Sequence, residues 1–210
     1  MTMTFEPNSS EEKALFDGFR STATALISDN LNRLPAGNGL RPFHKPNGLM
    51  IGRALTVRVA AGDNKHIHLA LDMVKPGDVI VVDGDGETTR ALIGGIMVAI
   101  AKSRGAAGFV LHGAVRDTDE IGSDTFPVFA HAAIHRGPYK NGPGYINVSV
   151  ALNGMVVSPG DIVVGDRDGV VAFTQEEAPA LLEATLAQAR KEEEIMAQIA
   201  AGTYKGAYAK

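Results

Sequence analysis

A thirteen-residue segment that occurs twice limits what this chain can fold into. Residues 74–86 and residues 157–169 are identical at eight of thirteen aligned positions. Each copy combines a Pro-Gly-Asp turn, a run of aliphatic residues typical of a short buried strand, and an Asp/Gly turn. Two copies that begin 83 residues apart are too few for a solenoid. The repeat therefore predicts two similar strands, which we expect on opposite sides of one core.

Hydrophobic periodicity predicts a mixture of helices and strands in the rest of the chain. Helices are predicted at about 9–34, 64–74, 91–104, from 119 and at about 175–200, and strands at 49–60, 106–111, near 128–130, 146–150, 161–165 and 169–173. Thr174 and Glu177 match a capping box for the last helix, whose first turn Pro179 should kink or delay. This mixture of helices and strands predicts an α/β fold, as a single domain over residues 1–210. The short antiparallel-type strands are too numerous for a plain doubly wound sheet.

The composition excludes several classes of site and partner. The 210 residues contain no cysteine, which rules out disulfides, cysteine-bound zinc and a thiol nucleophile. Tryptophan is absent, aromatic residues make up 6% and the net charge is −4, so nucleic acid and anionic membranes are poor partners. No apolar run reaches the roughly 18 residues of a membrane span, and the N-terminus has no signal-peptide pattern. We expect a cytoplasmic protein.

The residues best suited to chemistry lie in the segment 94–120. A buried strand is predicted to end before Arg116 and Asp117, and ligands of α/β folds bind at that edge of the sheet. Upstream, Gly94 and Gly95 precede helical residues whose first amide groups can receive an anion. A guanidinium, a carboxylate and free amides suit a small anionic substrate held by a hard cation such as Mg²⁺.

These and other polar residues also have purely structural interpretations. An Arg-Asp pair alone is more often a solvated or turn-stabilising pair. Asp83 and Asp85, in the first copy of the repeat, could bind a cation, although solvated turn carboxylates are commoner. His66 and His68 lie two residues apart on a predicted helix, so they face different directions and are interpreted as structural.

Several separated segments, in order along the chain, resemble one known family. They are residues 91–95, 101–108 and 113–117, together with 75–79, 143–148 and 159–163. On these segments the chain is similar to the RraA-like family, over about residues 12 to 202. That family includes 4-hydroxy-4-methyl-2-oxoglutarate / 4-carboxy-4-hydroxy-2-oxoadipate aldolases and regulators of ribonuclease E. The resemblance implies a β/β/α swivelling-type domain whose long C-terminal helix packs on a neighbouring subunit of a homotrimer or hexamer.

The same resemblance implies a class II pyruvate aldolase site that requires Mg²⁺ or Mn²⁺. Such a site cleaves a small 2-oxo acid to pyruvate and is expected to decarboxylate oxaloacetate. By motif position, Asp117 would ligate the metal, and Arg116 would bind the pyruvate oxygens and stabilise the enolate. The pyruvate carboxylate would be held where the helix starts, by the amides of Ile96 and Met97 beside Gly94 and Gly95.

Two further acidic positions belong to the site that the resemblance implies. Glu120 matches the last position of the family's Arg-Asp-x-x-Glu/Asp pattern. Glu192, on the predicted C-terminal helix, would reach a neighbour's site and orient a metal-bound water, with Glu193 and Glu194 as alternatives.

The chain departs from the aldolase motif at one position. The motif has an aspartate twenty-one residues before the arginine, where this chain has Gly95. That aspartate helps to hold metal-bound water, so its loss affects the base that retro-aldol cleavage needs at the C4 hydroxyl. A water or another carboxylate, such as Asp85, is a candidate substitute. Because oxaloacetate decarboxylation needs no such base, we expect it to survive better than aldol cleavage.

Two alternative functions stay open at this point. The chain also resembles non-catalytic ribonuclease E regulators, an interpretation that Gly95 favours and the long glutamate-bearing helix opposes. A different enolate-forming lyase, with a sugar-acid-derived substrate, would use the same residues. A methyltransferase is rejected, because no Gly-x-Gly-x-x-Gly follows a first strand. A Schiff-base route is not favoured, since Lys65, Lys75 and Lys102 are interpreted as solvated.

Overall fold

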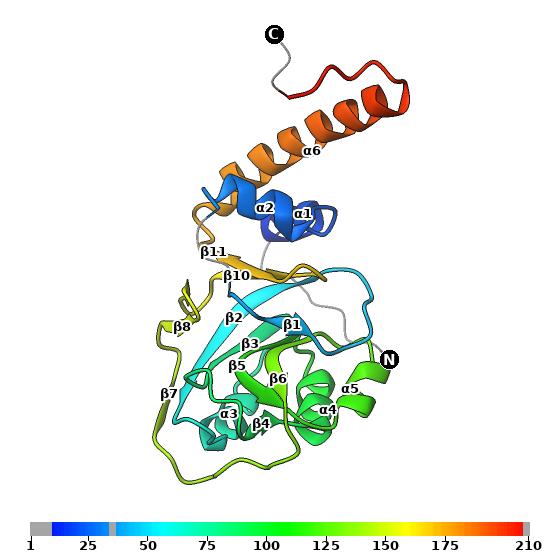
Figure 1. Ribbon diagram of the computed structural model, residues 1–210. Coiled ribbons are helices and arrows are strands. Elements are labelled where there is room, and N and C mark those ends of the chain that lie inside the picture. Colours follow the sequence, from blue (N-terminus) through cyan, green and yellow to red (C-terminus); the bar gives the residue numbers. More distant parts are fainter. Residues whose placement is uncertain (1–9, 34–36, 208–210) are drawn as a thin grey trace.

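A mixed sheet of nine strands organises the computed structural model, which describes residues 10–33 and 37–207 (Figure 1). Seven strands follow the order β1-β6-β5-β3-β2-β10-β11, while β4 pairs with β5 and β7 pairs with β2. Two further strands, β8 and β9, form a separate hairpin. The bounds are β1 Arg41–Pro42, β2 Met50–Val59, β3 Asp78–Asp83, β4 Ala91–Ile93, β5 Gly108–Val115, β6 Val128–Ala133, β7 Gly144–Ile146, β8 Val150–Leu152, β9 Met155–Val157, β10 Ile162–Gly165 and β11 Val170–Phe173.

The two copies of the repeat lie on the two sides of one strand. The first copy contains β3, which pairs with β2 in parallel, and the second contains β10, which pairs with β2 in antiparallel orientation. Arg53 on β2 is opposite Asp78 on one side and Ile162 on the other. The prediction of two buried strands is confirmed, but they share one sheet and do not lie on opposite sides of a core.

Matching hydrogen bonds explain why the repeated residues recur. Before each strand, the aspartate of the Pro-Gly-Asp turn accepts from an amide three residues back, at 2.8 Å from Lys75 to Asp78 and at 2.8 Å from Ser158 to Asp161. Gly77 and the equivalent glycine at 160 have φ of 85° and 86°, which L-residues with side chains rarely adopt. The repeat is therefore a structural device for starting two strands.

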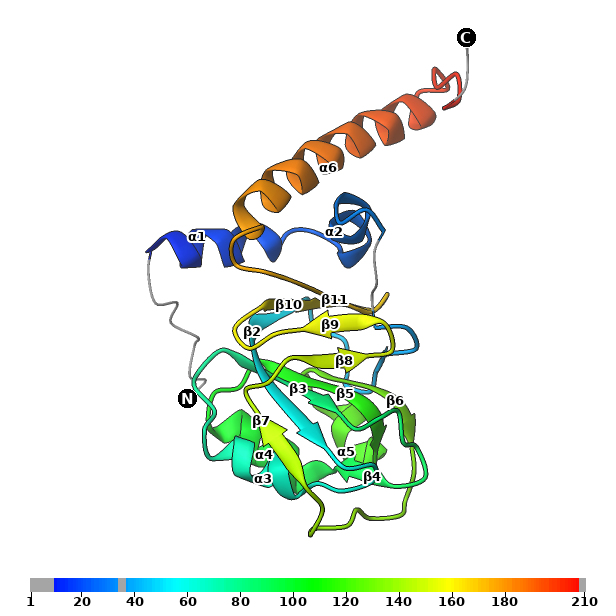
Figure 2. The ribbon, with the colours of Figure 1, turned by 90° about the vertical axis from the view of Figure 1, so that its left-hand side faces the viewer.

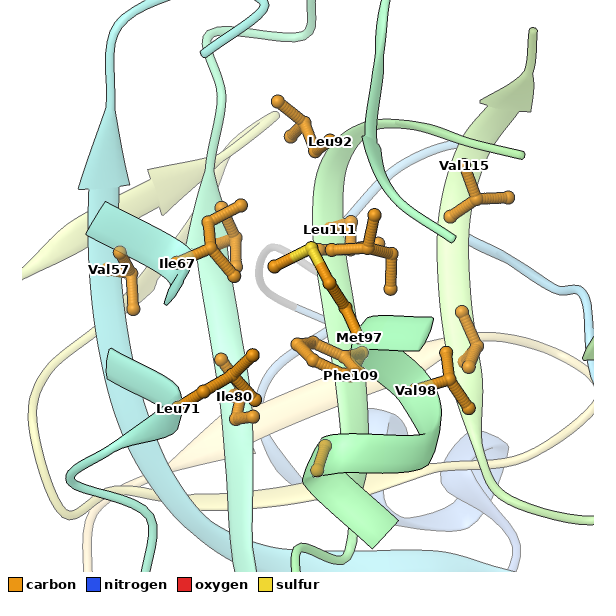
Figure 3. Close-up of a cluster of buried hydrophobic side chains, with 14 of the residues drawn as sticks. Val57, Ile67, Leu71, Ile80, Leu92, Met97, Val98, Phe109, Leu111 and Val115 are labelled. Carbon is orange, nitrogen blue, oxygen red and sulfur yellow. The ribbon is translucent and has the colours of Figure 1, made fainter. Parts of the chain in front are cut away.

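Helices and the hairpin cover different parts of the sheet. The helices are α1 Ser10–Phe19, α2 Thr24–Asn30, α3 Lys65–Leu71, α4 Gly95–Ser103, α5 Thr118–Ser123 and α6 Ala178–Ala200. On one face, α3 and α4 pack on β2, β3, β5 and β6 through the apolar cluster that Figure 3 shows. On the other face, residues of β8 and β9 pack on β3 and β5. A third cluster joins α1, α2 and the start of α6 to β10 and β11.

The predicted N-terminal helix is two helices in the structure. Its predicted ends, residues 9 and 34, lie outside the described residues, and between them α1 stops at Phe19 and α2 starts at Thr24. The Thr22 hydroxyl donates to the Phe19 carbonyl, while the Thr24 amide and hydroxyl donate to the Asp166 carboxylate at 2.8 and 2.6 Å. Hydroxyl side chains that bond to nearby backbone compete with helix continuation, so the uninterrupted helix was a wrong prediction.

Two boundaries near the site also differ from the prediction. The helix expected over 91–104 begins only at Gly95, because Ala91–Ile93 is strand β4, paired in parallel with β5. The strand expected to end at residue 111 continues to Val115 as β5. Arg116 and Asp117 therefore follow the strand directly, closer to the sheet than the sequence indicated.

The C-terminal helix confirms its prediction and projects away from the sheet (Figures 1 and 2). Pro179 lies in its first turn. Just before it, the Thr174 amide donates to the Glu177 carboxylate at 3.1 Å and the Glu177 amide donates to the Thr174 hydroxyl at 3.2 Å, which is the reciprocal pair of a capping box. Near its start, Leu181 is buried, whereas Met196 and Ile199 near its end are 64% and 50% exposed. Within the described chain, no helix is both long and apolar enough to span a membrane.

Candidate active site

The turn after β5 brings the predicted arginine and aspartate to the edge of the sheet. Asp117 adopts a left-handed backbone, with φ 61° and ψ 42°, immediately before α5. Aspartate is one of the few residues other than glycine that visits this region. Its Oδ2 accepts a hydrogen bond from the Gly95 amide at 2.9 Å and lies 3.8 Å from Arg116 Nε. The strand end and the start of α4 are thus joined through one carboxylate oxygen.

Two glycines at the start of α4 leave the room that the site's side chains occupy. A Cβ built on Gly94 would overlap Asp117 Oδ2 and lie 3.1 Å from Arg116 Nε. A Cβ built on Gly95 would overlap the carboxylate of Glu120. The side chain that lies against Gly95 is therefore Glu120, from α5, and Asp85 does not take that position. A side chain at position 94 would displace the Asp117 carboxylate, and one at position 95 would displace that of Glu120.

The amides at the start of α4 are only partly free to bind an anion. The Gly95 amide bonds to Asp117, and the Met97 amide donates to the Gly94 carbonyl at 3.0 Å. The Ile96 amide makes no hydrogen bond to any described residue, and its side chain is 77% exposed. Of the two amides expected to hold a carboxylate, the structure leaves that of Ile96 available.

An open cleft of about 490 Å³ lies beside these groups. Residues 116–120 line one side and Ala133, Ile134 and His135 line the other. The Ile134 amide donates to the Val115 carbonyl at 2.9 Å, which keeps the two sides together. The side chains of Arg116 and Asp117 are each 43% exposed, so both reach the cleft. His135 was not anticipated from the sequence, because it belongs to an irregular stretch with no periodic pattern.

The donor set of the cleft fits a hard cation and not zinc. Among the described residues, no three His, Cys, Asp or Glu side chains are grouped so that they could hold a metal ion. Asp117 and Glu120 offer two carboxylates, and Asp117 Oδ1 accepts no hydrogen bond from the residues described. Mg²⁺ typically uses one or two carboxylates and keeps several waters, whereas structural zinc needs four protein ligands. The residues present therefore fit Mg²⁺ or Mn²⁺.

Glu192 lies far from this cleft within one chain. It is exposed on α6, where its carboxylate accepts from Gln188 at 3.1 Å, and Glu193 and Glu194 are exposed beside it. In both views α6 is at one end of the molecule and α4 and α5 are at the other (Figures 1 and 2). The structure groups Arg116, Asp117, Glu120 and Gly95, and it does not bring Glu192 to them.

A polar cleft at the carboxyl ends of parallel strands is typical of α/β proteins that bind a small ligand at that edge. Comparison with known proteins identifies the particular family. The chain belongs to the RraA-like family, whose model, described as Aldolase/RraA, matches residues 24–172. This match covers the whole cleft and all strands from β1 to β10, together with part of β11.

Individual relatives agree with this assignment. A protein of Halalkalibacterium halodurans, provisionally named 4-hydroxy-4-methyl-2-oxoglutarate aldolase, is 40% identical over 74% of each chain. An uncharacterized protein from Pseudomonas syringae has a crystal structure with a TM-score of 0.80, at 26% identity over 94% of this chain and 96% of its own. The RNA-processing inhibitor RraA from Thermus thermophilus gives a TM-score of 0.66, at 32% identity over 73% and 93%. The names in this family thus include an aldolase and a regulator.

Proposed function

We propose that the protein is a divalent-metal-dependent lyase that cleaves a 2-oxo acid to pyruvate through an enolate. The observation that carries this proposal is the convergence of Arg116, Asp117 and Glu120 on the two glycines at the start of α4. The aldolase name of a relative at 40% identity supports the same reaction class. A 2-oxo dicarboxylic acid such as 4-hydroxy-4-methyl-2-oxoglutarate is the substrate we expect.

Each residue of the cleft has a part in this reaction. Asp117 would hold Mg²⁺ or Mn²⁺ through Oδ1, the oxygen that no described residue occupies. When bound, such an ion supplies Lewis-acid polarisation of the keto group. Arg116 binds the substrate oxygens and stabilises the negative charge that develops on the enolate. The free amide of Ile96 donates a hydrogen bond to the substrate carboxylate at the start of α4.

Glu120 takes the role of the aspartate that the chain lacks at position 95. Its carboxylate lies where a side chain at that position would begin, and no described residue donates to it. In retro-aldol cleavage the C3–C4 bond breaks, and its electron pair passes to C3 as the enolate. The C4 hydroxyl gives up its proton and becomes a keto group, and C3 then gains a proton to give pyruvate. Glu120 receives the hydroxyl proton, directly or through a water.

The assembly belongs to the same proposal. The distal part of α6 carries Met196 and Ile199 with little cover from its own chain. A second subunit under that helix would bury these side chains, and Glu192, Glu193 or Glu194 would reach the neighbouring cleft. We expect a homotrimer or a hexamer, which light scattering after size-exclusion chromatography measures.

The decisive experiment is an assay of pyruvate release from oxaloacetate and from 4-hydroxy-4-methyl-2-oxoglutarate, with Mg²⁺ and then with excess chelator. Turnover of both substrates that the chelator abolishes supports the lyase. Turnover of oxaloacetate alone would show an intact enolate site without a base for aldol cleavage. No release from either substrate would overturn the proposal and favour a binding regulator, as the name of the RNA-processing inhibitor RraA suggests.

A further inference from the structure

Arg90 connects the segment that leads into α4 with the segment that follows the cleft residues Ile134 and His135. It precedes β4, the strand that leads into Gly94 and α4. Its guanidinium donates to the Gly137 carbonyl at 2.8 Å and to the Tyr139 hydroxyl at 2.8 Å. Its Cζ also lies 3.9 Å from the centroid of the Tyr139 ring. One guanidinium thus makes hydrogen bonds through its edge and a ring contact through its face, all to the short segment from Gly137 to Tyr139.

That segment, residues 134–142, is here called the wall segment, since its first residues line the cleft. It has no regular secondary structure of its own, and its shape depends on ties to its neighbours. Backbone bonds join the Ala91 amide to the Arg136 carbonyl at 2.8 Å and the Tyr139 amide to the Gly62 carbonyl at 2.8 Å. Arg90 is the side chain that holds the turn between these two ties.

The turn at Gly137, which Arg90 holds, contacts Arg116, the residue assigned to enolate stabilisation. A Cβ built on Gly137 would lie 3.1 Å from Arg116 Nη1, closer than ordinary contact. Gly137 therefore packs against the Arg116 guanidinium on one side, while its carbonyl accepts from Arg90 on the other. A shift of this peptide would change the space in which the Arg116 side chain can settle.

We propose that Arg90 is a positioning residue for Arg116 and acts through the peptide at Gly137. The proposal rests on the function proposed above, because it concerns the rate of that reaction. An arginine that served stability alone would lower the free energy of unfolding when replaced, without a specific loss of reaction rate. Tyr139 is 54% exposed, and contacts of a guanidinium with an exposed ring contribute little to stability. Losing them should leave the fold intact and misplace Arg116.

The test is a double-mutant cycle between Arg90→Gln and Arg116→Lys, measured as kcat and KM for pyruvate release. Small misplacements of a catalytic group are costly, so we expect Arg90→Gln alone to lower kcat about 10- to 100-fold. KM should change little, since Arg90 does not touch the substrate. With Arg116→Lys already present, Arg90→Gln should add less than about a twofold loss, because coupled residues are not additive. Arg90→Lys should recover part of the rate.

Arg104→Gln is the matched control. Arg104 is also part-exposed and its Nη2 lies 2.8 Å from an Asp72 oxygen, but it ends α4 away from the cleft. This variant should keep the wild-type kcat. Hydrogen exchange supplies a readout that needs no activity, because amides of the wall segment should exchange faster in Arg90→Gln and not in Arg104→Gln.

The outcomes separate this inference from the proposed function. A wild-type protein that releases no pyruvate refutes the proposed function. An active wild type in which Arg90→Gln has no effect, or an equal effect in both backgrounds, refutes the positioning role alone. Unchanged exchange in the wall segment also overturns it. If Arg90→Gln fails to fold, Arg90→Lys keeps the charge but loses the planar fork that bonds to Gly137 and Tyr139 together, and an unchanged kcat together with unchanged exchange in that variant counts against the inference.

Discussion

Asp83 and Asp117 stand at the ends of the neighbouring parallel strands β3 and β5, and their carboxylates are used differently. Asp83 Oδ1 accepts from the Asp85 amide two residues on and lies 3.4 Å from His112 Nδ1. Its other oxygen lies 3.8 Å from Arg58 Nε. Asp117 is instead held through Oδ2 alone, by an amide 22 residues away in sequence.

The comparison suggests a criterion that separates structural from functional carboxylates: whether both oxygens already have hydrogen-bond or ion-pair partners within the protein. A carboxylate bonded within its own turn and paired on both oxygens has little capacity left for a ligand. One that is oriented by a distant backbone amide keeps an oxygen for the cleft. The second copy of the repeat follows the first rule, since Asp166 accepts from the Asp168 amide at 2.9 Å and from Thr24 through both of its oxygens.

The largest effect should come from removing the carboxylate that keeps an oxygen free. We expect Asp117→Ala to lower the rate of pyruvate release by about 10³-fold or more, because metal polarisation is worth several kcal/mol. Mg²⁺ dependence should disappear with it. Asp83→Ala is the matched variant and should keep its rate while losing about 1–2 kcal/mol of stability. Equal rates for Asp117→Ala and wild type would break the comparison.

A smaller effect, divided between substrates, is expected at Glu120. Glu120→Gln keeps the shape of the side chain and removes its ability to take a proton. Aldol cleavage should fall about 100-fold, in the range of general-base losses, and oxaloacetate decarboxylation should fall by a smaller factor. Asp85→Asn, in the turn of the repeat, should alter neither rate. Parallel losses of both reactions in Glu120→Gln would contradict the assigned proton transfer.

Restoring the aspartate of the motif tests the same assignment from the opposite direction. Because a Cβ at Gly95 would overlap the Glu120 carboxylate, Gly95→Asp alone should lower the aldolase rate about tenfold. Combining it with Glu120→Ala should bring the rate back toward that of the wild type, since one carboxylate then occupies the position. Kinetics on both variants measure this. A double variant slower than the single one would show that position 95 and Glu120 are not interchangeable.

The sequence predicted the elements and turns that depend on neighbouring residues, and it missed the features that depend on contacts with residues far away in the chain. Both turns of the repeat, β2, α6 and the capping box before it follow from local patterns, and these predictions are confirmed. The break between α1 and α2 needs Asp166, and β4 needs a register with β5, so neither was predicted. At the site, Arg116 and Asp117 were identified from motifs. The contact between the Glu120 carboxylate and Gly95 could not be predicted from the sequence, because it depends on how closely α5 approaches α4.

A more modest effect is expected from crowding Arg116 without changing any charge. Gly137→Ala should lower kcat about three- to tenfold, because the new methyl group must push Nη1 by a few tenths of an ångström. Gly122→Ala is the control, since a Cβ there meets only the Phe43 carbonyl oxygen at 3.5 Å. Steady-state kinetics compare the two variants. If both lose rate equally, helix α5 and not the wall segment controls the arginine.

The smallest effect on activity should come from a carboxylate that is fully used on both oxygens. Asp63 is 2% exposed, and it accepts from the Lys65 amide through Oδ1 and from the Asn141 and Gly142 amides through Oδ2, at 2.7–2.8 Å. Burial favours its neutral form, but the three amides outweigh burial and hold the pKa of Asp63 below its ordinary value of 3.8. By the comparison above, Asp63 is structural even though it holds the end of the wall segment.

A lowered pKa in the folded state fixes the sign of the pH dependence. The stabilisation from Asp63 is fully present above the unfolded-state pKa of 3.8 and is lost as pH falls through the lower folded-state value. Asp63→Asn should therefore cost about 1.5–3 kcal/mol at neutral pH, as for hydrogen bonds to a charged group, with kcat almost unchanged. Denaturant unfolding from pH 7 to pH 2 should show the two proteins converging in acid. A difference in stability that persists at pH 2, or a large loss of kcat, would mean that full occupation of a carboxylate does not mark it as structural.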